Sequence, residues 1–175
     1  DDVGKQVAML AYGYSLLGEP KPDGKADQWL GLLYACVNCA VQIESLKAEI
    51  FRLREMSDPE QKTAELTREL DDWTSVAREL ESIDSTLFHR TLESVRSRTE
   101  PMLEVEQMVM EYERGDEKIR RLVRQVAQLS LEGIRQTLEQ IDVTFDQWDW
   151  ESDLVWSGEV RESMQKLAST PFATV

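Results

Sequence analysis

The sequence predicts a mainly α-helical protein with one short β segment. Apolar residues recur every three or four positions along most of the chain, which is the spacing of one face of a helix. Clusters of Pro, Gly and Asp divide this pattern into separate helices. A strand-like alternation, made by Val143, Phe145 and Trp148, is confined to one short stretch.

Two helices are expected in the first third of the chain. Asp1 or Asp2 can cap the first helix, and Gly18 ends it. A loop containing Pro and Gly, from 19 to 25, separates it from a long helix that begins at Asp27. The apolar stripe of that helix consists of Trp29, Leu32, Leu33, Cys36, Val37, Ala40, Ile43, Leu46, Ile50 and Leu53.

The middle of the chain is dense in charge. Ser57-Asp58-Pro59 is expected to end the long helix and to cap the next one. Ser85 starts a further helical pattern, which Pro101 should kink or split. The region from 44 to 113 is therefore predicted to be a helical hairpin or bundle with solvated charged faces.

Two more helices are expected near the end of the chain. A turn at Gly115-Asp116 precedes a strong helix, which Asp116 caps and which runs to about Ile141. The range 143–148 follows as the short strand. The range 159–168 is predicted to be a last short helix.

The chain of 175 residues is acidic, with 34 Asp and Glu against 20 Lys and Arg. This excess argues against nonspecific phosphate binding by this piece alone, although another domain could carry a basic surface.

The longest largely apolar run, Trp29 to Ile43, is too short for a membrane span. We expect both ends to be cuts through a larger protein, so that apolar segments 7–14 and 171–175 pack on its sheet strands.

The most unusual stretch is the aromatic–acid segment, Gln147 to Gly158, in which three tryptophans are interleaved with acids. Acids are costly to bury unpaired, whereas tryptophan brings a large apolar area. One interpretation is that the rings wall a pocket in which one carboxylate faces a cation. The other is an aromatic turn that covers a core edge, with the acids in water. Composition alone favours the second.

Cys36-Val37-Asn38-Cys39 is a CxxC pattern inside the apolar stripe of the long helix. One cysteine pair and a single histidine, His89, are too few ligands for a structural zinc site. A thioredoxin-like site needs a βαβ unit, which the pattern does not predict. We therefore expect two buried thiols, no metal, and a surface or interface histidine.

Several segments resemble the class I arginyl-tRNA synthetases, or arginine–tRNA ligases, and occur in that family's order. Asp2-Val3-Gly4-Lys5-Gln6-Val7 looks like the D-x-G-x-Q segment that follows the family's ATP-binding signature. The range 111–117 is similar to the family's acidic Gly-Asp turn, and a long helix follows at 119–141. Val143-Thr144-Phe145-Asp146 and Trp150-Glu151-Ser152 look like the strand and the Glu-Ser turn that enter the arginine pocket.

The resemblance covers 1–17 and 111–175, and the wording Trp-Glu-Ser-Asp-Leu-Val at 150–155 resembles the archaeal-type branch. Between about 45 and 110 no specific match is recognised, and this part is interpreted as a lineage-specific helical insertion. The implied fold is a fragment of a Rossmann-type catalytic domain with a helical connective insertion.

In that arrangement, residues 1–20 belong to the catalytic core, 21–116 to the insertion, and 117–175 to the long helix, the strand and the arginine-pocket turn. The resemblance implies a cytoplasmic enzyme that activates L-arginine with ATP, bound as its Mg complex, and transfers arginine to tRNA(Arg). The family's HIGH-type and KMSKS-type signatures are both missing here. We therefore expect this fragment alone to be inactive, with ATP bound mainly by parts outside it.

By the same resemblance, Glu151 is the carboxylate that binds the substrate guanidinium, and Asp2, Gly4 and Gln6 are active-site neighbours. A carboxylate meets the guanidinium fork with two charge-assisted hydrogen bonds, which neither lysine nor citrulline can match. The tryptophans would exclude water and strengthen that ion pair. The neighbouring acids would be solvated or hydrogen-bonded, and the fragment would hold no catalytic residue and no metal ligand.

The residue pattern alone also allows a protein of another class. Heptad-like leucines and charge-rich faces from 44 to 113 are typical of a noncatalytic helical scaffold or a coiled-coil interaction module. Such a module would self-associate, and the DNA on either side of it would encode no synthetase signatures.

Overall fold

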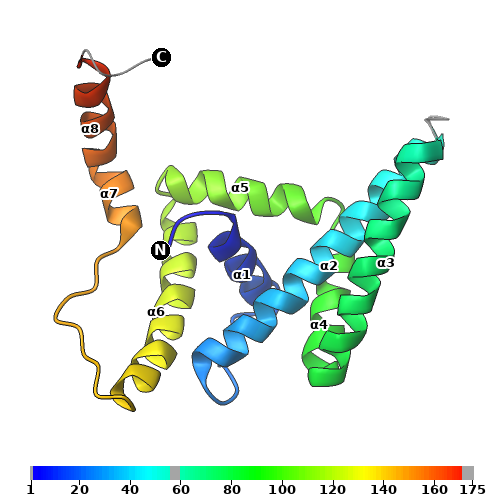
Figure 1. Ribbon diagram of the computed structural model, residues 1–175, viewed down its shortest axis with the longest axis horizontal. Helices are drawn as coiled ribbons and strands as arrows, with labels where there is room; N and C mark the ends of the chain where they lie inside the picture. Colours follow the sequence, from blue (N-terminus) through cyan, green and yellow to red (C-terminus); the bar gives the residue numbers. More distant parts are fainter. Residues whose placement is uncertain (1, 56–59, 171–175) are drawn as a thin grey trace.

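The computed structural model describes residues 2–55 and 60–170, which form eight α-helices and no β-strand. The helices are α1 (Lys5–Leu16), α2 (Ala26–Glu55), α3 (Glu60–Ile83), α4 (Ser85–Arg96), α5 (Pro101–Glu113), α6 (Glu117–Glu139), α7 (Glu151–Ser157) and α8 (Glu159–Ala168). In Figure 1, α1 lies at the centre between α2 and α6, and α5 crosses one end of it. Helices α7 and α8 project away from this body.

Helix α1 is central because its apolar residues are buried on several sides. Ala11 is fully buried and Tyr14 is 2% exposed, in a core shared with α2, α4, α5 and α6. The expectation that 7–14 packs on sheet strands is therefore wrong, because neighbouring helices supply the apolar partners. The matching expectation for 171–175 lies outside the described residues.

Two glycines allow helices to approach α2 closely. A Cβ on Gly13 of α1 would lie 2.0 Å from Cγ2 of Val37 on α2. A Cβ on Gly133 of α6 would lie 2.7 Å from the backbone N of Asp27, at the start of α2. Real side chains do not tolerate such distances, so both crossings depend on glycine.

Glycines in the left-handed conformation end two of the helices around the site. Gly18 has φ 80° just past α1, and Gly115 has φ 83° just past α5. At the second turn, the Gly115 N–H donates to the Tyr112 carbonyl at 2.9 Å. Asp116 then caps α6 by accepting from the Ile119 N–H at 3.0 Å, as predicted. This turn fixes the direction in which α6 leaves α5.

The charged middle of the chain forms α3, α4 and α5 together with the second half of α2. Pro101 is the first residue of α5 and separates it from α4, which confirms the predicted split. Asp84 caps α4 by accepting from the Leu87 N–H at 2.8 Å. The predicted stop and cap at 57–59 lie outside the described residues.

Helices α3 and α4 pack on α2 around a second apolar cluster that contains Cys36 and Cys39. Both thiols are fully buried, which confirms the prediction of buried helical cysteines. Burial raises the pKa of Cys36 to about 12 and that of Cys39 to about 11, so both remain protonated at neutral pH. His89 of α4 is exposed and lies 2.8 Å from a carboxylate oxygen of Glu81.

The strand predicted at Val143, Phe145 and Trp148 does not form among the described residues. Residues 143–150 adopt neither helix nor strand and lead back past α6 to α7 (Figure 1). A strand needs a hydrogen-bonded partner, and no other extended segment of the described chain lies beside this one. The rings of Phe145 and Trp148 meet edge to face instead, with centroids 5.2 Å apart.

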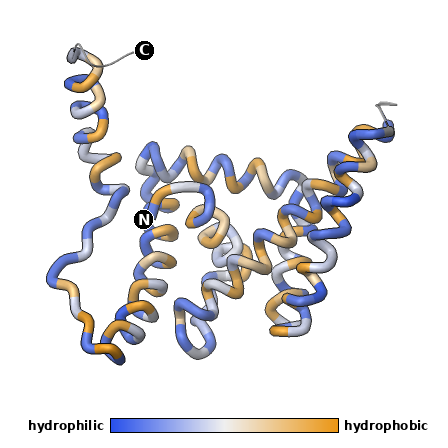
Figure 2. Tube along the Cα trace, viewed as in Figure 1, coloured by the Kyte–Doolittle hydropathy of each residue, from blue (hydrophilic) through white to orange (hydrophobic). Residues whose placement is uncertain are grey.

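Polar and apolar residues alternate along every helix in Figure 2, as expected for helices with one buried side.

Among the described helices, only α2 is long and apolar enough to cross a membrane by length and composition. This differs from the sequence-based expectation, in which its apolar run was too short for a membrane span. Half of that window is buried inside the protein, and core helices of soluble proteins pass the same test.

Candidate functional site

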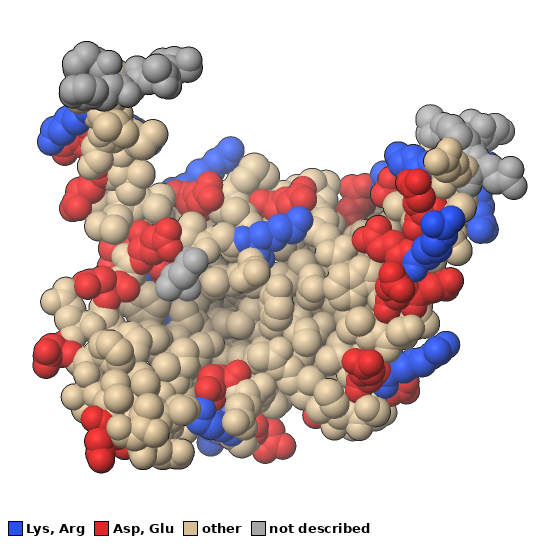
Figure 3. Space-filling view, viewed as in Figure 1, with Lys and Arg blue, Asp and Glu red and all other residues tan. Residues whose placement is uncertain are grey.

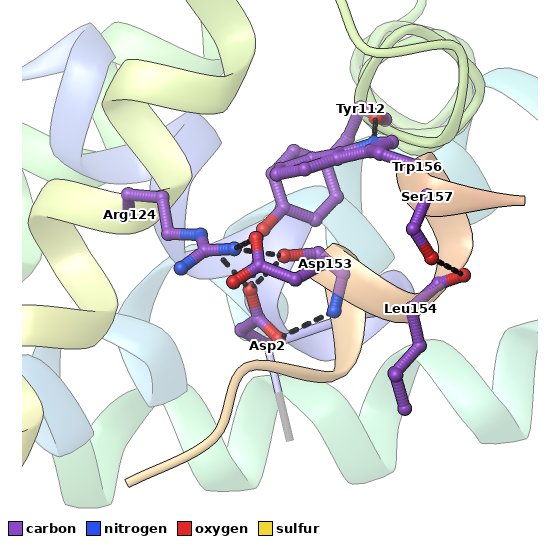
Figure 4. Close-up of polar contacts among 8 residues, drawn as sticks. Asp2, Tyr112, Arg124, Asp153, Leu154, Trp156 and Ser157 are labelled. Carbon is purple, nitrogen blue, oxygen red and sulfur yellow. Dashed lines mark hydrogen bonds and ion pairs between the residues drawn. The ribbon is translucent and has the colours of Figure 1, made fainter. Parts of the chain in front are cut away.

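The candidate site lies where the start of α7 meets α6 and the residues before α1 (Figure 4). Three polar residues are buried together there: Asp2, Tyr112 and Ser152, which are 2%, 3% and 1% exposed. They come from three distant parts of the chain. Their burial requires that each polar group finds a partner within the protein.

The Asp2 carboxylate is the centre of this cluster. Its Oδ2 accepts hydrogen bonds from the Tyr112 hydroxyl and the Ser152 hydroxyl, each at 2.6 Å. Its Oδ1 accepts from the Ser152 backbone N–H at 3.1 Å. The prediction that Asp2 caps α1 is therefore wrong: its carboxylate binds residues of α5 and α7, and Gly4 occupies the cap position.

Arg124 of α6 supplies the positive charge. One terminal nitrogen donates to the Ser152 hydroxyl at 2.6 Å and also to Asp153. The Nε atom lies 3.3 Å from Oδ2 of Asp2. One guanidinium thus joins a buried carboxylate to an exposed one, while its own side chain is 19% exposed.

The buried partners set the pKa values of the cluster. Burial alone would raise the pKa of Asp2, but hydrogen bonds from Ser152 and Tyr112 and the charge of Arg124 outweigh it, so the pKa lies below its usual value. Burial, followed by the hydrogen bond to Asp2, raises the pKa of Tyr112 to about 12. At neutral pH the cluster therefore contains a carboxylate, a guanidinium and a neutral phenol.

The three tryptophans of the aromatic–acid segment each contact an arginine of α6. The Arg124 guanidinium carbon lies 4.2 Å from the ring centroid of Trp150. The corresponding distances are 3.8 Å from Arg120 to Trp156 and 5.1 Å from Arg135 to Trp148. Each pair lies within the range of a cation–π interaction, so the whole segment is held along α6.

Trp156 also ties α7 to the end of α5. Its indole N–H donates to the Tyr112 carbonyl at 2.9 Å, and its ring meets the Tyr112 ring edge to face at 5.1 Å. Gly115 lies beneath this indole, where an added Cβ would be 3.7 Å from the ring. The position of α7 is therefore fixed from both α5 and α6.

A hollow of about 240 Å³ opens between α1, α6 and the aromatic–acid segment. Trp148 and Trp150 form one wall, and Asp2 and Asp149 are also among the lining residues. Apolar residues of α1 and α6 line the rest. Each of the two sequence interpretations describes part of this site: the rings wall a hollow and a carboxylate faces a cation, while the acids of the segment itself are exposed.

Comparison with known proteins gives a consistent result. The chain is 36% identical to the arginine–tRNA ligase of Sulfolobus acidocaldarius over 167 residues, which is 95% of this chain and 26% of that protein. It is 35% identical to the ligases of Saccharolobus solfataricus and Aeropyrum pernix, over 97% and 99% of this chain. The chain is homologous to part of the archaeal arginine–tRNA ligases. No family model and no solved structure matches it.

The homologous part is about a quarter of the length of these arginine–tRNA ligases. The similarity extends across the middle of the chain, between about 45 and 110, where the sequence contains no specific family motif. The archaeal origin of these relatives also agrees with the resemblance of the sequence at 150–155 to the archaeal-type branch.

The structure places the predicted site residues of this chain in different environments. Asp2 is buried in the cluster, whereas Gln6 is exposed in the first turn of α1. Gly4 precedes α1 with φ 109°, in a region that favours glycine. Glu151 is the exposed first residue of α7, and its side chain makes no hydrogen bond or ion pair with the rest of the described chain. Among the same residues, no group of three or more possible ligands could hold a metal ion.

Sequence reasoning missed Tyr112 and Arg124, and also the helix α7. Arg120 and Arg124 are one turn apart on the polar side of α6, which suggests solvated charges unless a partner is known. One feature of the sequence pointed to these contacts. The aromatic–acid segment is rich in tryptophans and acids, which are the partners that arginines of the preceding helix can bind. The sequence did not reveal which arginine would meet which ring.

Proposed function

We propose that this chain is part of the catalytic domain of an arginine–tRNA ligase. The full-length protein would activate L-arginine with ATP, forming arginyl-adenylate, and pass the arginyl group to the 3′ end of tRNA(Arg). The observation that carries this proposal is the similarity to arginine–tRNA ligases over at least 95% of the chain in three relatives. The same similarity favours an enzyme over a noncatalytic scaffold.

In this proposal, residues 1–20 and 117–175 belong to a Rossmann-type catalytic core, and 21–116 form its helical insertion. Residues 143–148 would pair with a strand that another part of the enzyme supplies. ATP and its Mg ion would be bound mainly by those other parts, with Asp2, Gly4 and Gln6 as neighbours. The enzyme would act in the cytoplasm.

Contacts with tRNA would also depend on other parts of the enzyme. On the face shown in Figure 3, acidic and basic side chains are scattered over the rim and over α2 and α3, and they form no continuous basic patch. The chain carries a formal net charge of -14. Because tRNA binding relies on neutralising phosphates, we assign most of that contact to surfaces outside this chain.

Glu151 is the carboxylate we propose to bind the arginine guanidinium. Asp2 and Asp153 already bind Arg124, and Asp149 accepts a hydrogen bond from Gln147. Glu151 has no such partner among the described residues, although it directly precedes the buried Ser152. Its carboxylate is therefore free to meet a guanidinium from outside the chain with two charge-assisted hydrogen bonds.

The proposal is tested by arginine-dependent pyrophosphate exchange with the full-length ligase. Glu151→Gln keeps the shape but removes the charge. In this proposal other parts of the enzyme enclose Glu151 and the bound guanidinium, and losing one partner of such an enclosed ion pair costs about 2–5 kcal/mol. We expect the arginine KM to rise at least about 30-fold while the ATP KM is nearly unchanged. Asp149→Asn is the matched control, and both Asp149→Asn and Asp153→Asn should have smaller effects. The assignment is wrong if Glu151→Gln stays within about threefold of the parent, or if Asp149→Asn is the most damaging of the three.

A further inference from the structure

We propose that Arg124 is the positioning residue of the arginine-recognition turn in the ligase. This inference rests on the proposed function, because the turn it positions is the one that carries Glu151. Arg124 does not contact Glu151. It contacts the residues on either side of it, and so it fixes the backbone from which the recognition carboxylate projects.

The contacts of Arg124 surround Glu151 in sequence. The guanidinium stacks on Trp150, the residue before Glu151, at 4.2 Å from the ring centroid. It donates to the hydroxyl of Ser152, the residue after Glu151, at 2.6 Å, and also binds Asp153. Three of the four residues from 150 to 153 are thus held by one side chain of α6, and Glu151 alone remains free of it.

Asp2 connects this arrangement to the segment before α1. Its carboxylate binds the hydroxyl and the backbone N–H of Ser152 and lies 3.3 Å from Nε of Arg124. The turn is therefore fixed at its backbone as well as at its side chains. A recognition carboxylate needs this kind of support, because a shift of about 1 Å in a bound substrate can cost on the order of a hundredfold in rate.

Only an arginine can make this set of contacts. Its guanidinium lies over the Trp150 ring and at the same time donates to Ser152 and Asp153. A lysine at the same position would keep the charge but could not stack and form the fork of hydrogen bonds together. Arg124→Lys is therefore the variant that separates geometry from charge.

The experiment uses the full-length ligase with Arg124→Lys and Arg124→Ala. Arg121→Ala is the matched control, because Arg121 is an exposed arginine on the same helix whose side chain makes no hydrogen bond or ion pair with the described chain. Hydrogen exchange is measured for peptides that cover 150–157 and for peptides of α1 and α2. The arginine KM and the ATP KM are measured by pyrophosphate exchange.

For both Arg124 variants we expect exchange in 150–157 to become at least about tenfold faster, and exchange in α1 and α2 to change much less. We expect the arginine KM to rise on the order of tenfold to a hundredfold, with the ATP KM unchanged. Guanidinium chloride at a non-denaturing concentration should restore the protection of 150–157 in Arg124→Ala, and sodium chloride of equal ionic strength should not. The control variant should behave as the parent does.

Two results would overturn the inference. Unchanged exchange in 150–157 would show that Arg124 does not hold the turn. Faster exchange with an unchanged arginine KM would show that it serves stability only. A failure of the proposed function is seen separately, as a full-length protein without arginine-dependent exchange, and the hydrogen exchange of 150–157 still decides whether Arg124 holds the turn.

Discussion

At the scale of single residues, the site depends on the buried carboxylate of Asp2. Three donors converge on it, from Tyr112, from the Ser152 hydroxyl and from the Ser152 backbone. A buried carboxylate without these partners would be strongly destabilising, so the cluster is stable only as a unit.

Replacing Asp2 by Asn should therefore weaken the fold. The substitution removes the charge that Arg124 faces and leaves donors of the cluster without a charged acceptor. We expect the free energy of unfolding, measured by urea titration, to fall by about 1.5–3 kcal/mol at neutral pH. Asp23→Asn, in the exposed loop before α2, is the matched control and should change it little. Equal stabilities of the two variants would contradict the role given to Asp2.

The same group predicts a pH dependence. The pKa of Asp2 is lowered in the folded state, so as the pH falls the unfolded chain takes up the proton first. The stabilisation is fully present above the usual carboxyl pKa of 3.8 and is lost as the pH falls through the lower folded value. In urea titrations the difference in the free energy of unfolding between the parent and Asp2→Asn should therefore become smaller below about pH 4. A difference that stays constant down to pH 2 would exclude this linkage.

The sequence could identify Asp2 as a good helix cap but could not locate its partners. Tyr112 and Ser152 lie 110 and 150 residues away in the chain. A pattern of local spacing contains no information about contacts at that separation. The family resemblance predicted that Asp2 lies near the active site, and the structure shows which groups its side chain binds.

At the scale of secondary structure, the helices were predictable because apolar spacing and capping residues are local. Gly18, Pro101 and Asp116 lie at helix ends, as their chemistry indicates. No strand forms at 143–148 in the described chain, because a strand depends on a partner that local alternation cannot supply. Helix α7 was missed because its tryptophans and acids indicated a turn, whereas its position is set by contacts with α5 and α6.

The crossing of α1 and α2 gives a prediction about these elements. Gly13→Ala places a Cβ 2.0 Å from Cγ2 of Val37, so the helices must move apart. Overpacking of this kind costs about 1–3 kcal/mol of unfolding free energy. Gly31→Ala, in α2 with open space around its Cβ, is the control and should stabilise the helix by up to about 1 kcal/mol. Urea unfolding measures the change in the free energy of unfolding for both variants. A Gly13→Ala variant more stable than the parent would contradict the close crossing of the two helices.

At the scale of the whole molecule, the body of packed helices presents α7 and α8 at one side (Figure 1). The described residues of α8 are all exposed, including Val160, Met164 and Leu167. Composition and charge could predict a helical, acidic protein, and they could not predict this arrangement. The resemblance in the first and last parts of the chain pointed to arginine–tRNA ligases, and the similarity over nearly the whole chain supports it.

The most direct measurement is the amino-acid specificity of the full-length protein in pyrophosphate exchange. The arginine pocket we propose discriminates by leaving buried polar groups unpaired when the wrong side chain binds, which is worth on the order of 10⁴ in kcat/KM. We therefore predict ATP-dependent exchange with L-arginine and rates lower by about that factor with lysine and citrulline. Comparable exchange with lysine or citrulline, or none with arginine, would contradict the assignment of this chain to arginine recognition.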